Sequence, residues 1–375
     1  MKVMTVLGTR PEIIRLSRVV AALDRCFDHV LVHTGQSYDY ELSEAHFRDL
    51  ELRQPDHFLA AAGKNAVETI GNILARMDDL LETVRPDAFL VLGDTNSCLS
   101  AYAAKRRHIP VFHMEAGNRC FDQRVPEETN RKIVDHLADI NLPYSNIARE
   151  CLLREGLAPD RVIKTGSPMF EVLHHHRAKI DRSDVLARLQ LQADGYFLLS
   201  AHREENVESP ERFAGLIAIL QGLVVDFGLP VIVSTHPRMR KRLEASQITL
   251  DPLVVLMKPL GFIDYVKLQL EARAVLSDSG SISEESSILN FPALNLREAH
   301  ERHEAMEEAS VMMTGLNYAT VRSALQMLAG QKRGDGRVFR LVEDYAVPNV
   351  SEKVARIILS YTGYVNRVVW QQPLA

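Results

Sequence analysis

Short apolar runs alternate along the chain with longer stretches in which apolar residues recur every three or four positions. Apolar runs of this length predict buried strands, and in the first third of the chain they cover residues 2–8, 29–34, 88–92 and 109–113. Helical spacing of apolar residues appears at 13–23 and 67–84, and Pro11 stands at a helix start. Strands that alternate with helices of this length predict right-handed βαβ units and a parallel sheet.

The same alternation restarts after a stretch near residues 168–191 that reads as helical. Further strands are expected at 196–200, 230–234, 254–257 and 274–276. We therefore predict an α/β protein of two Rossmann-like, doubly wound domains facing a cleft. The expected divisions are residues 1–167, residues 168–350, and a terminal helix in residues 351–375 that packs back on the first domain.

Composition narrows the classes of function without changing this fold prediction. The 375 residues are 46% hydrophobic and 25% charged, with a net charge of -5 and no block of one sign. A nucleic-acid partner is not expected, because it would need a clustered basic face. The four cysteines show no CxxC pair or metal spacing, and no apolar run reaches the roughly 18 residues of a membrane span. We expect a cytoplasmic protein with reduced thiols and no membrane association.

Polar residues directly follow the predicted strands. In open parallel sheets ligands bind beyond the carboxyl ends of the strands, so these segments are expected to converge on the cleft. They are Gly8-Thr9-Arg10, Gly93-Asp94-Thr95, Glu115-Ala116-Gly117, His202-Arg203 and Asp278-Ser279-Gly280.

The segment from Asp278 to Glu285 follows a strand and opens a helix. Its small residues would let backbone N–H groups approach an anion at the helix N-terminus, with Glu285 placed for ribose hydroxyls. An ordinary helix cap explains the same residues equally well. Arg10, Arg302 and the His202-Arg203 pair are candidates to neutralise a phosphate; each could also be a surface residue.

Three carboxylates of the first domain are candidates for proton transfer: Asp94, Glu115 and Glu127. Asp94 could instead cap a helix, and one of Glu127 and Glu128 could serve the helix dipole. Glu115 is harder to explain structurally, since it follows the apolar strand at 111–114. No motif for a nicotinamide cofactor or a metal occurs, so neither is expected.

Together these segments resemble the non-hydrolysing UDP-N-acetylglucosamine 2-epimerase family over most of the chain. The order and spacing of the motifs carry the resemblance: GTRPEIIR at 8–15, TGQ at 34–36, GDT at 93–95, EAGNR at 115–119, PEETNR at 126–131, AHREEN at 201–206, STHPR at 234–238 and SDSGSISEES at 277–286. The resemblance implies the type B glycosyltransferase fold, UDP held mainly by the second domain, and a homodimer.

The resemblance also implies roles for individual residues. Asp94, Glu115 and Glu127 would be the acid/base carboxylates, with His202 beside the leaving UDP. The residues expected to bind substrate or UDP are Arg10, Arg15, Arg131, His236, Ser279, Gly280, Glu285 and Arg302. Arg15 stands where the N-acetylglucosamine enzymes have lysine.

Three segments look closer to one branch of the family, UDP-N-acetyl-L-fucosamine synthase. They are residues 8–17, 119–131 and 296–315, although His303 stands where proline is usual in that branch. The branch implies epimerisation of UDP-2-acetamido-2,6-dideoxy-L-talose for surface polysaccharide synthesis. The alternatives are conversion of UDP-N-acetylglucosamine to UDP-N-acetylmannosamine, a glycosyltransferase of the same fold, and a UDP-sugar sensor without activity.

Overall fold

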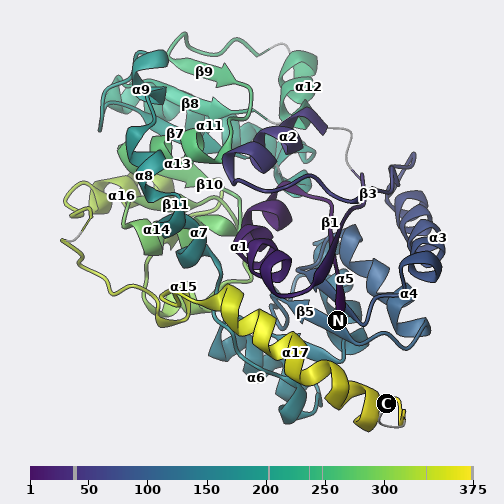
Figure 1. Ribbon diagram of the computed structural model, residues 1–375. Coiled ribbons are helices and arrows are strands. Elements are labelled where there is room, and N and C mark those ends of the chain that lie inside the picture. Colours follow the sequence, from purple (N-terminus) through teal and green to yellow (C-terminus); the bar gives the residue numbers. More distant parts are fainter. Residues whose placement is uncertain (37–39, 202, 236, 247, 335, 373–375) are drawn as a thin grey trace. The chain divides into compact units, whose positions relative to one another are not determined.

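Two six-stranded parallel sheets organise the computed structural model, which describes residues 1–36, 40–201, 203–235, 237–246, 248–334 and 336–372 (Figure 1). The chain forms two units. Unit 1 comprises Met1–His175 and Asp344–Ala375, and unit 2 comprises His176–Glu343.

The sheet of unit 1 has the strand order β3-β2-β1-β4-β5-β6, and every pair is parallel. Its strands are β1 (Lys2–Leu7), β2 (Asp28–His33), β3 (His57–Phe58), β4 (Ala88–Leu92), β5 (Val111–Met114) and β6 (Ile140–Leu142). Its helices are α1 (Arg10–Cys26), α2 (Tyr40–Asp49), α3 (Ala66–Val84), η1 (Asn96–Ser100), α4 (Ala101–Arg106), α5 (Pro126–Leu137), α6 (Asn146–Arg154), η2 (Pro159–Arg161), α7 (Met169–His175) and α17 (Val350–Val368). The chain passes from β1 to β2 and β3 and then returns to β4 on the other side of β1. Ligands of doubly wound sheets bind at such a switch point.

The first βα turn shows how local sequence sets this edge. The β1 strand is buried from Val3 to Leu7. Thr9 then caps α1 in a capping box with Glu12, and Pro11 occupies the first turn, where its missing N–H costs no helical hydrogen bond. The polar Gly8-Thr9 turn is thereby fixed at the carboxyl end of β1.

The last helix, α17, belongs to unit 1 and runs beside α1 (Figure 1). Polar contacts hold its first turns: Arg25 pairs with Glu352 at 2.7 Å, and the Ser351 amide donates to Glu171 at 2.9 Å. Unit 1 is therefore built from both ends of the chain, and α17 packs on the helix that follows the first strand.

Unit 2 repeats the doubly wound pattern with the strand order β12-β11-β10-β7-β8-β9, again all parallel. Its strands are β7 (Phe197–Ser200), β8 (Val231–Ser234), β9 (Val254–Met257), β10 (Ala274–Ser277), β11 (Ala293–Asn295) and β12 (Met312–Met313). Its helices are α8 (Arg177–Arg182), α9 (Val185–Arg188), α10 (Glu204–Val207), α11 (Pro210–Phe227), α12 (Pro237–Ser246), α13 (Phe262–Glu271), α14 (Ser281–Leu289), α15 (His303–Glu307) and α16 (Tyr318–Leu328); η3 (Glu343–Tyr345) marks the return to unit 1.

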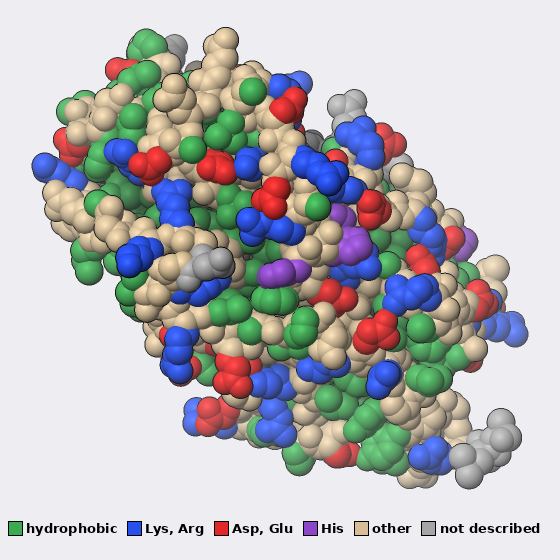
Figure 2. Space-filling model, turned by 60° about the vertical axis from the view of Figure 1, so that its left-hand side comes forward, with side chains coloured by type: hydrophobic (Ala, Val, Ile, Leu, Met, Phe, Trp, Pro, Cys, Tyr) green, Lys and Arg blue, Asp and Glu red, His purple; other side chains and the backbone are tan. Residues whose placement is uncertain are grey.

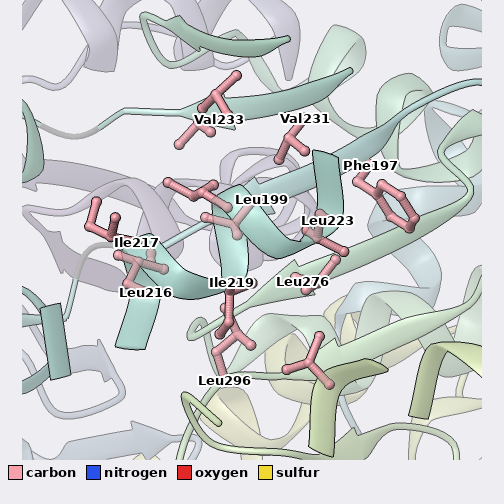
Figure 3. Packing of buried hydrophobic residues seen from close by; sticks show 14 of the residues in the cluster. Phe197, Leu199, Leu216, Ile217, Ile219, Leu223, Val231, Val233, Leu276 and Leu296 are labelled. Atoms are coloured by element: carbon pink, nitrogen blue, oxygen red, sulfur yellow. The ribbon is translucent and has the colours of Figure 1, made fainter. Parts of the chain in front are cut away.

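A hydrophobic core of unit 2 lies between one face of this sheet and helix α11 (Figure 3). Alternate residues of β7, Phe197 and Leu199, point toward Leu216 and Leu223 of α11. All four side chains are fully buried, so this face of the sheet is closed to water. Polar candidate residues of unit 2, such as Ser279, lie instead in the loops after the strands.

The predicted α/β fold with two Rossmann-like sheets is confirmed, and each strand expected from an apolar run exists within two residues of its expected ends. Four strands were missed: β3 and β12, of two residues each, and β6 and β11, of three. Runs this short show no periodicity, and their pairing partners supply the structure. Among the described residues, no helix is long and apolar enough to cross a membrane.

Lysine and arginine side chains are interspersed with aspartate and glutamate across the described part of the face in Figure 2. The sequence has no block of one charge sign, and the described part of this face likewise mixes the two signs.

Candidate active site: polar clusters at the strand ends

The carboxylate of Glu12 connects the two loops that flank the switch point of unit 1. One of its oxygens accepts from the amides of Gly8 and Thr9 at 2.8 and 2.7 Å, and the other accepts from the Thr95 hydroxyl at 2.7 Å. Glu12 is fully buried, and this burial raises the pKa of its carboxyl. The loop after β1 and the loop after β4 are therefore held together.

Asp94 lies in the second of these loops and is bound by Arg131 of α5. Two guanidinium nitrogens of Arg131 lie 2.6 and 3.0 Å from Oδ2 of Asp94. Asp94 does not cap the following helix, because the N-cap of η1 is Thr95, whose hydroxyl accepts from the Ser97 amide. The Asp94 carboxylate is instead presented at the strand end beside a buried cation.

One face of helix α5 organises both carboxylate loops. Glu128, Arg131 and Asp135 stand three and then four positions apart and so share that face. Glu128 accepts from the Cys120 amide at 3.1 Å and from Arg131 at 3.0 Å. Burial by itself would raise the pKa of Glu128, but the Cys120 amide and the Arg131 charge outweigh burial and lower it.

Glu115 follows β5 directly, on the strand that pairs with β4. Its backbone is left-handed, with φ of 64°, a conformation that costs an ordinary residue roughly 1–2 kcal/mol. The Glu115 carboxylate lies 3.4 Å from Nε of Arg15, and both side chains are nearly buried. Strain in a non-glycine residue often marks a functional position.

The remaining candidates of unit 1 lie at helix starts. Arg10 is the first residue of α1, and Glu127 is the second residue of α5. Both are half-exposed. Glu127 neighbours the fully buried Glu128, so the accessible carboxylate of this pair is Glu127 and the structural one is Glu128.

The loop after β10 in unit 2 has the small residues of an anion cradle. Gly280 is the N-cap of α14 and has no side chain with which to cap the helix. Asp278 is fully buried and accepts from the Arg203 amide at 3.0 Å, which joins this loop to the loop after β7. The Ser279 hydroxyl accepts from the amide of Ser281, the first residue of α14, at 3.4 Å. The helix-cap explanation of this segment therefore holds for Ser279.

A carboxylate packs directly under this loop. A Cβ added to Gly280 would lie 2.5 Å from Oε1 of Glu301, so only glycine fits here without displacement. Glu301 is held by Arg297 at 2.7 Å and lies 3.5 Å from Arg203. The cradle is thus shaped by a fixed acidic side chain and its two arginine partners.

Two further candidates of unit 2 are buried in polar contacts. Glu285 accepts from the Gln269 amide at 2.6 Å, and Arg302 pairs with Glu284 at 3.3 Å. Ser279 lies on the cradle, where its hydroxyl is 3.1 Å from that of Ser281. The side chains of His202 and His236 lie outside the described residues.

The sequence analysis missed the residues that hold the candidates in place. Glu12, Asp135 and Gln269 are all buried and polar, and each contacts a loop or side chain that was singled out. A signal existed for Asp135, because its helical spacing from Glu128 and Arg131 predicts a shared face. Carboxylates paired with arginine at neighbouring strand ends form a site suited to proton transfer on an anionic substrate.

Known proteins share this two-sheet α/β architecture. A solved structure described as UDP-N-acetylglucosamine 2-epimerase from Rickettsia bellii is 46% identical, with a TM-score of 0.92 over 99% of this chain and 100% of that one. The UDP-GlcNAc 2-epimerase of Methanocaldococcus jannaschii, solved with UDP-GlcNAc and UDP, is 30% identical with a TM-score of 0.89 over 96% and 100% of the two chains. The fold is therefore that of the two-domain, type B glycosyltransferase-like epimerases.

A family model described as UDP-N-acetylglucosamine 2-epimerase matches residues 21–359. A curated relative from Pseudomonas aeruginosa, UDP-2,3-diacetamido-2,3-dideoxy-D-glucuronate 2-epimerase, is 30% identical over 90% of this chain and 96% of its own length. This chain belongs to the UDP-N-acetylglucosamine 2-epimerase family, whose named members are isomerases.

Proposed function

We propose that this protein inverts C2 of a UDP-activated 2-acetamido sugar. The observation that carries the proposal is the pair of carboxylates at neighbouring strand ends of unit 1, Asp94 against Arg131 and Glu115 against Arg15. Inversion at C2 needs a proton removed from one face and returned to the other, which requires more than one proton carrier. Asp94, Glu115 and Glu127 are the proposed carriers.

The proposed reaction is an elimination followed by an addition. A carboxylate takes the C2 proton, the C1–O bond to UDP breaks with its electron pair leaving on UDP, and a C1=C2 double bond forms. A second group then returns a proton to the opposite face of C2 while UDP adds again to C1. Direct deprotonation would leave a poorly stabilised carbanion, and the elimination avoids that species.

Unit 2 would hold the UDP part of the substrate. The small residues Ser279 and Gly280 at the N-terminus of α14 suit a phosphate, and the carboxylate of Glu285 suits ribose hydroxyls. Arg10, Arg302 and His202 would stabilise the charge on the departing diphosphate, and Arg15, Arg131 and His236 would contact the substrate. The homodimer and the role in surface polysaccharide synthesis stay predictions.

For the sugar itself, we propose UDP-2-acetamido-2,6-dideoxy-L-talose, converted to UDP-N-acetyl-L-fucosamine. The motifs at 8–17, 119–131 and 296–315 support this choice. The alternative, UDP-N-acetylglucosamine converted to UDP-N-acetylmannosamine, is at least as well supported by the names of the family and of its relatives. Each sugar should be offered separately, with the product identified by proton NMR. Turnover of UDP-N-acetylglucosamine alone would overturn the L-talo proposal.

The change Gly280→Ala should weaken UDP binding by about tenfold or more, equivalent to about 1.4 kcal/mol. The added methyl would lie 2.5 Å from Glu301, and Arg297 keeps that carboxylate from moving away freely. Calorimetric titration with UDP measures the effect. Gly330→Ala is the matched control, since no atom lies within 4 Å of its added Cβ. Equal UDP affinity in the two variants would remove Gly280 from the proposed cradle.

A further inference from the structure

His113 lies on β5 beneath the two carboxylate loops of unit 1 and is fully buried. Its Nε2 is 2.7 Å from the carbonyl oxygen of Gly93, the residue before Asp94. Its Nδ1 is 3.0 Å from Oδ1 of Asp135. One imidazole ring therefore joins the loop after β4 to the helix that supports the loop after β5.

The partners of the ring define its protonation. A backbone carbonyl can only accept, so Nε2 carries a proton. Asp135 also accepts from the Gly117 amide at 3.2 Å and from Arg119 at 2.7 Å, so its carboxyl oxygens serve as acceptors. Nδ1 faces the Asp135 carboxyl at 3.0 Å, and this contact favours a proton on Nδ1 as well, so we infer an imidazolium ring.

The loop after β5 requires support of this kind, because it turns through Glu115, a non-glycine residue in the left-handed region. Glu115 has φ of 64°, whereas Gly93 and Gly117 adopt φ of 79° and 83° without strain, because glycine has no Cβ. A strained backbone persists only where its surroundings fix it. The Gly117 amide and the Gly93 carbonyl are both fixed through the His113–Asp135 pair.

We propose that His113 is a positioning residue for the acid/base carboxylates: its buried imidazolium ties the peptide that precedes Asp94 to Asp135 under the loop of Glu115. The proposal rests on the proposed function, in which Asp94 and Glu115 act at C2. His113 itself touches neither the sugar nor the reacting atoms.

Charged groups around the ring favour the proton. Asp135 faces it from α5, and Asp94 acts on it from the loop after β4, while Arg119 is a like charge on the far side of Asp135. Burial by itself lowers the pKa of His113, but Asp135 and the Gly93 carbonyl outweigh burial and raise it. The pKa of His113 is therefore higher in the folded than in the unfolded protein. The protonated ring contributes its full stabilisation of the fold below about pH 6.5, and this contribution is lost as pH rises through the folded pKa.

The charge state of the His113 ring can be measured without an activity assay. The full chain would be labelled with nitrogen-15 histidine and its ring nitrogens followed as pH is raised through the ordinary histidine pKa of about 6.5. We expect one ring, absent from the His113→Gln variant, to keep protons on both nitrogens to a higher pH than an ordinary histidine does. A His113 ring that loses its second proton at or below about pH 6.5 would overturn the imidazolium.

Two uncharged variants test the positioning role. His113→Gln can place an amide near the Gly93 carbonyl, whereas the shorter His113→Asn reaches toward Asp135 only. Misplacing reacting groups by about 1 Å can cost roughly 100-fold, so kcat of His113→Asn should fall about 100-fold with little change in KM. The glutamine variant should recover part of that loss.

The control is His108→Asn, the same substitution at an exposed, left-handed position that asparagine tolerates. The fraction of each variant that binds UDP would be measured, and kcat would be divided by this fraction to correct for unfolded protein. A His113→Asn variant that matches the control, or a glutamine variant no better than asparagine, would contradict the positioning role. If the unmodified enzyme inverts neither sugar, the proposed function fails, while the nitrogen-15 result still decides the charge of His113.

Discussion

Replacing Glu115 with glutamine is expected to leave the fold intact and to reduce turnover by roughly 10²–10⁴-fold, the usual contribution of a positioned acid or base. Glutamine has nearly the size of glutamate, and its amide oxygen can still face Arg15, which lies 3.4 Å from the carboxylate. It cannot accept the C2 proton at neutral pH. Steady-state turnover on the accepted sugar measures the loss, with UDP binding as the check on folding.

The matched control for this variant is Glu150→Gln on helix α6. The Glu150 side chain is 56% exposed and pairs across the helix surface with Arg154. Its replacement should leave kcat within about twofold, since surface pairs contribute about 0–1 kcal/mol. Near-normal turnover of Glu115→Gln would show that Glu115 is not a proton carrier and would leave Asp94 and Glu127 to be tested.

The largest loss of stability is expected from Arg131→Met. Methionine has a comparable length but removes the cation that binds Asp94 at 2.6 Å and Glu128 at 3.0 Å. Breaking a buried ion pair from one side costs about 3–5 kcal/mol, because the remaining charge stays buried. Urea unfolding followed by circular dichroism measures this loss. Arg124→Met, whose side chain is 69% exposed, is the control and should cost less than about 1 kcal/mol.

The loss of unfolding free energy caused by Arg131→Met should also depend on pH. Arg131 helps to hold the pKa of Glu128 below its ordinary value of about 4.3, against the burial that would raise it. A carboxyl with a lowered folded pKa stabilises fully above its unfolded pKa, and this contribution disappears as pH falls through the folded value. The gap in unfolding free energy between the unmodified protein and Arg131→Met should therefore narrow in acid. A gap that stays constant from neutral pH into acid would contradict this coupling.

The fold could be predicted because its signals are local. Lys2–Leu7, the Gly8-Thr9 turn and Pro11 each specify one step of strand, turn and helix within a dozen residues. Strands β3 and β12, with two residues each, have no such signal. They exist because a neighbouring strand offers unpaired backbone groups, and that information comes from the fold rather than from the segment.

The candidate site could be predicted only in part. Among the described residues, Asp94, Glu115 and Ser279 lie after strand ends as the sequence predicts, since that position follows from the topology. The pairing of Asp94 with Arg131, 37 positions apart, could not be deduced from spacing. Nor could Glu128 be distinguished from Glu127, because one helical position decides which carboxylate is buried.

The central claim is that this enzyme breaks and remakes the C2–H bond of a UDP-2-acetamido sugar. The most direct test is to incubate the protein in deuterium oxide with UDP-2-acetamido-2,6-dideoxy-L-talose, and separately with UDP-N-acetylglucosamine, and to follow the C2 proton by NMR. We predict inversion at C2 with deuterium incorporated there, on the L-talo sugar. Inversion without deuterium incorporation on either sugar, or binding of both sugars with no exchange at C2, would contradict the account.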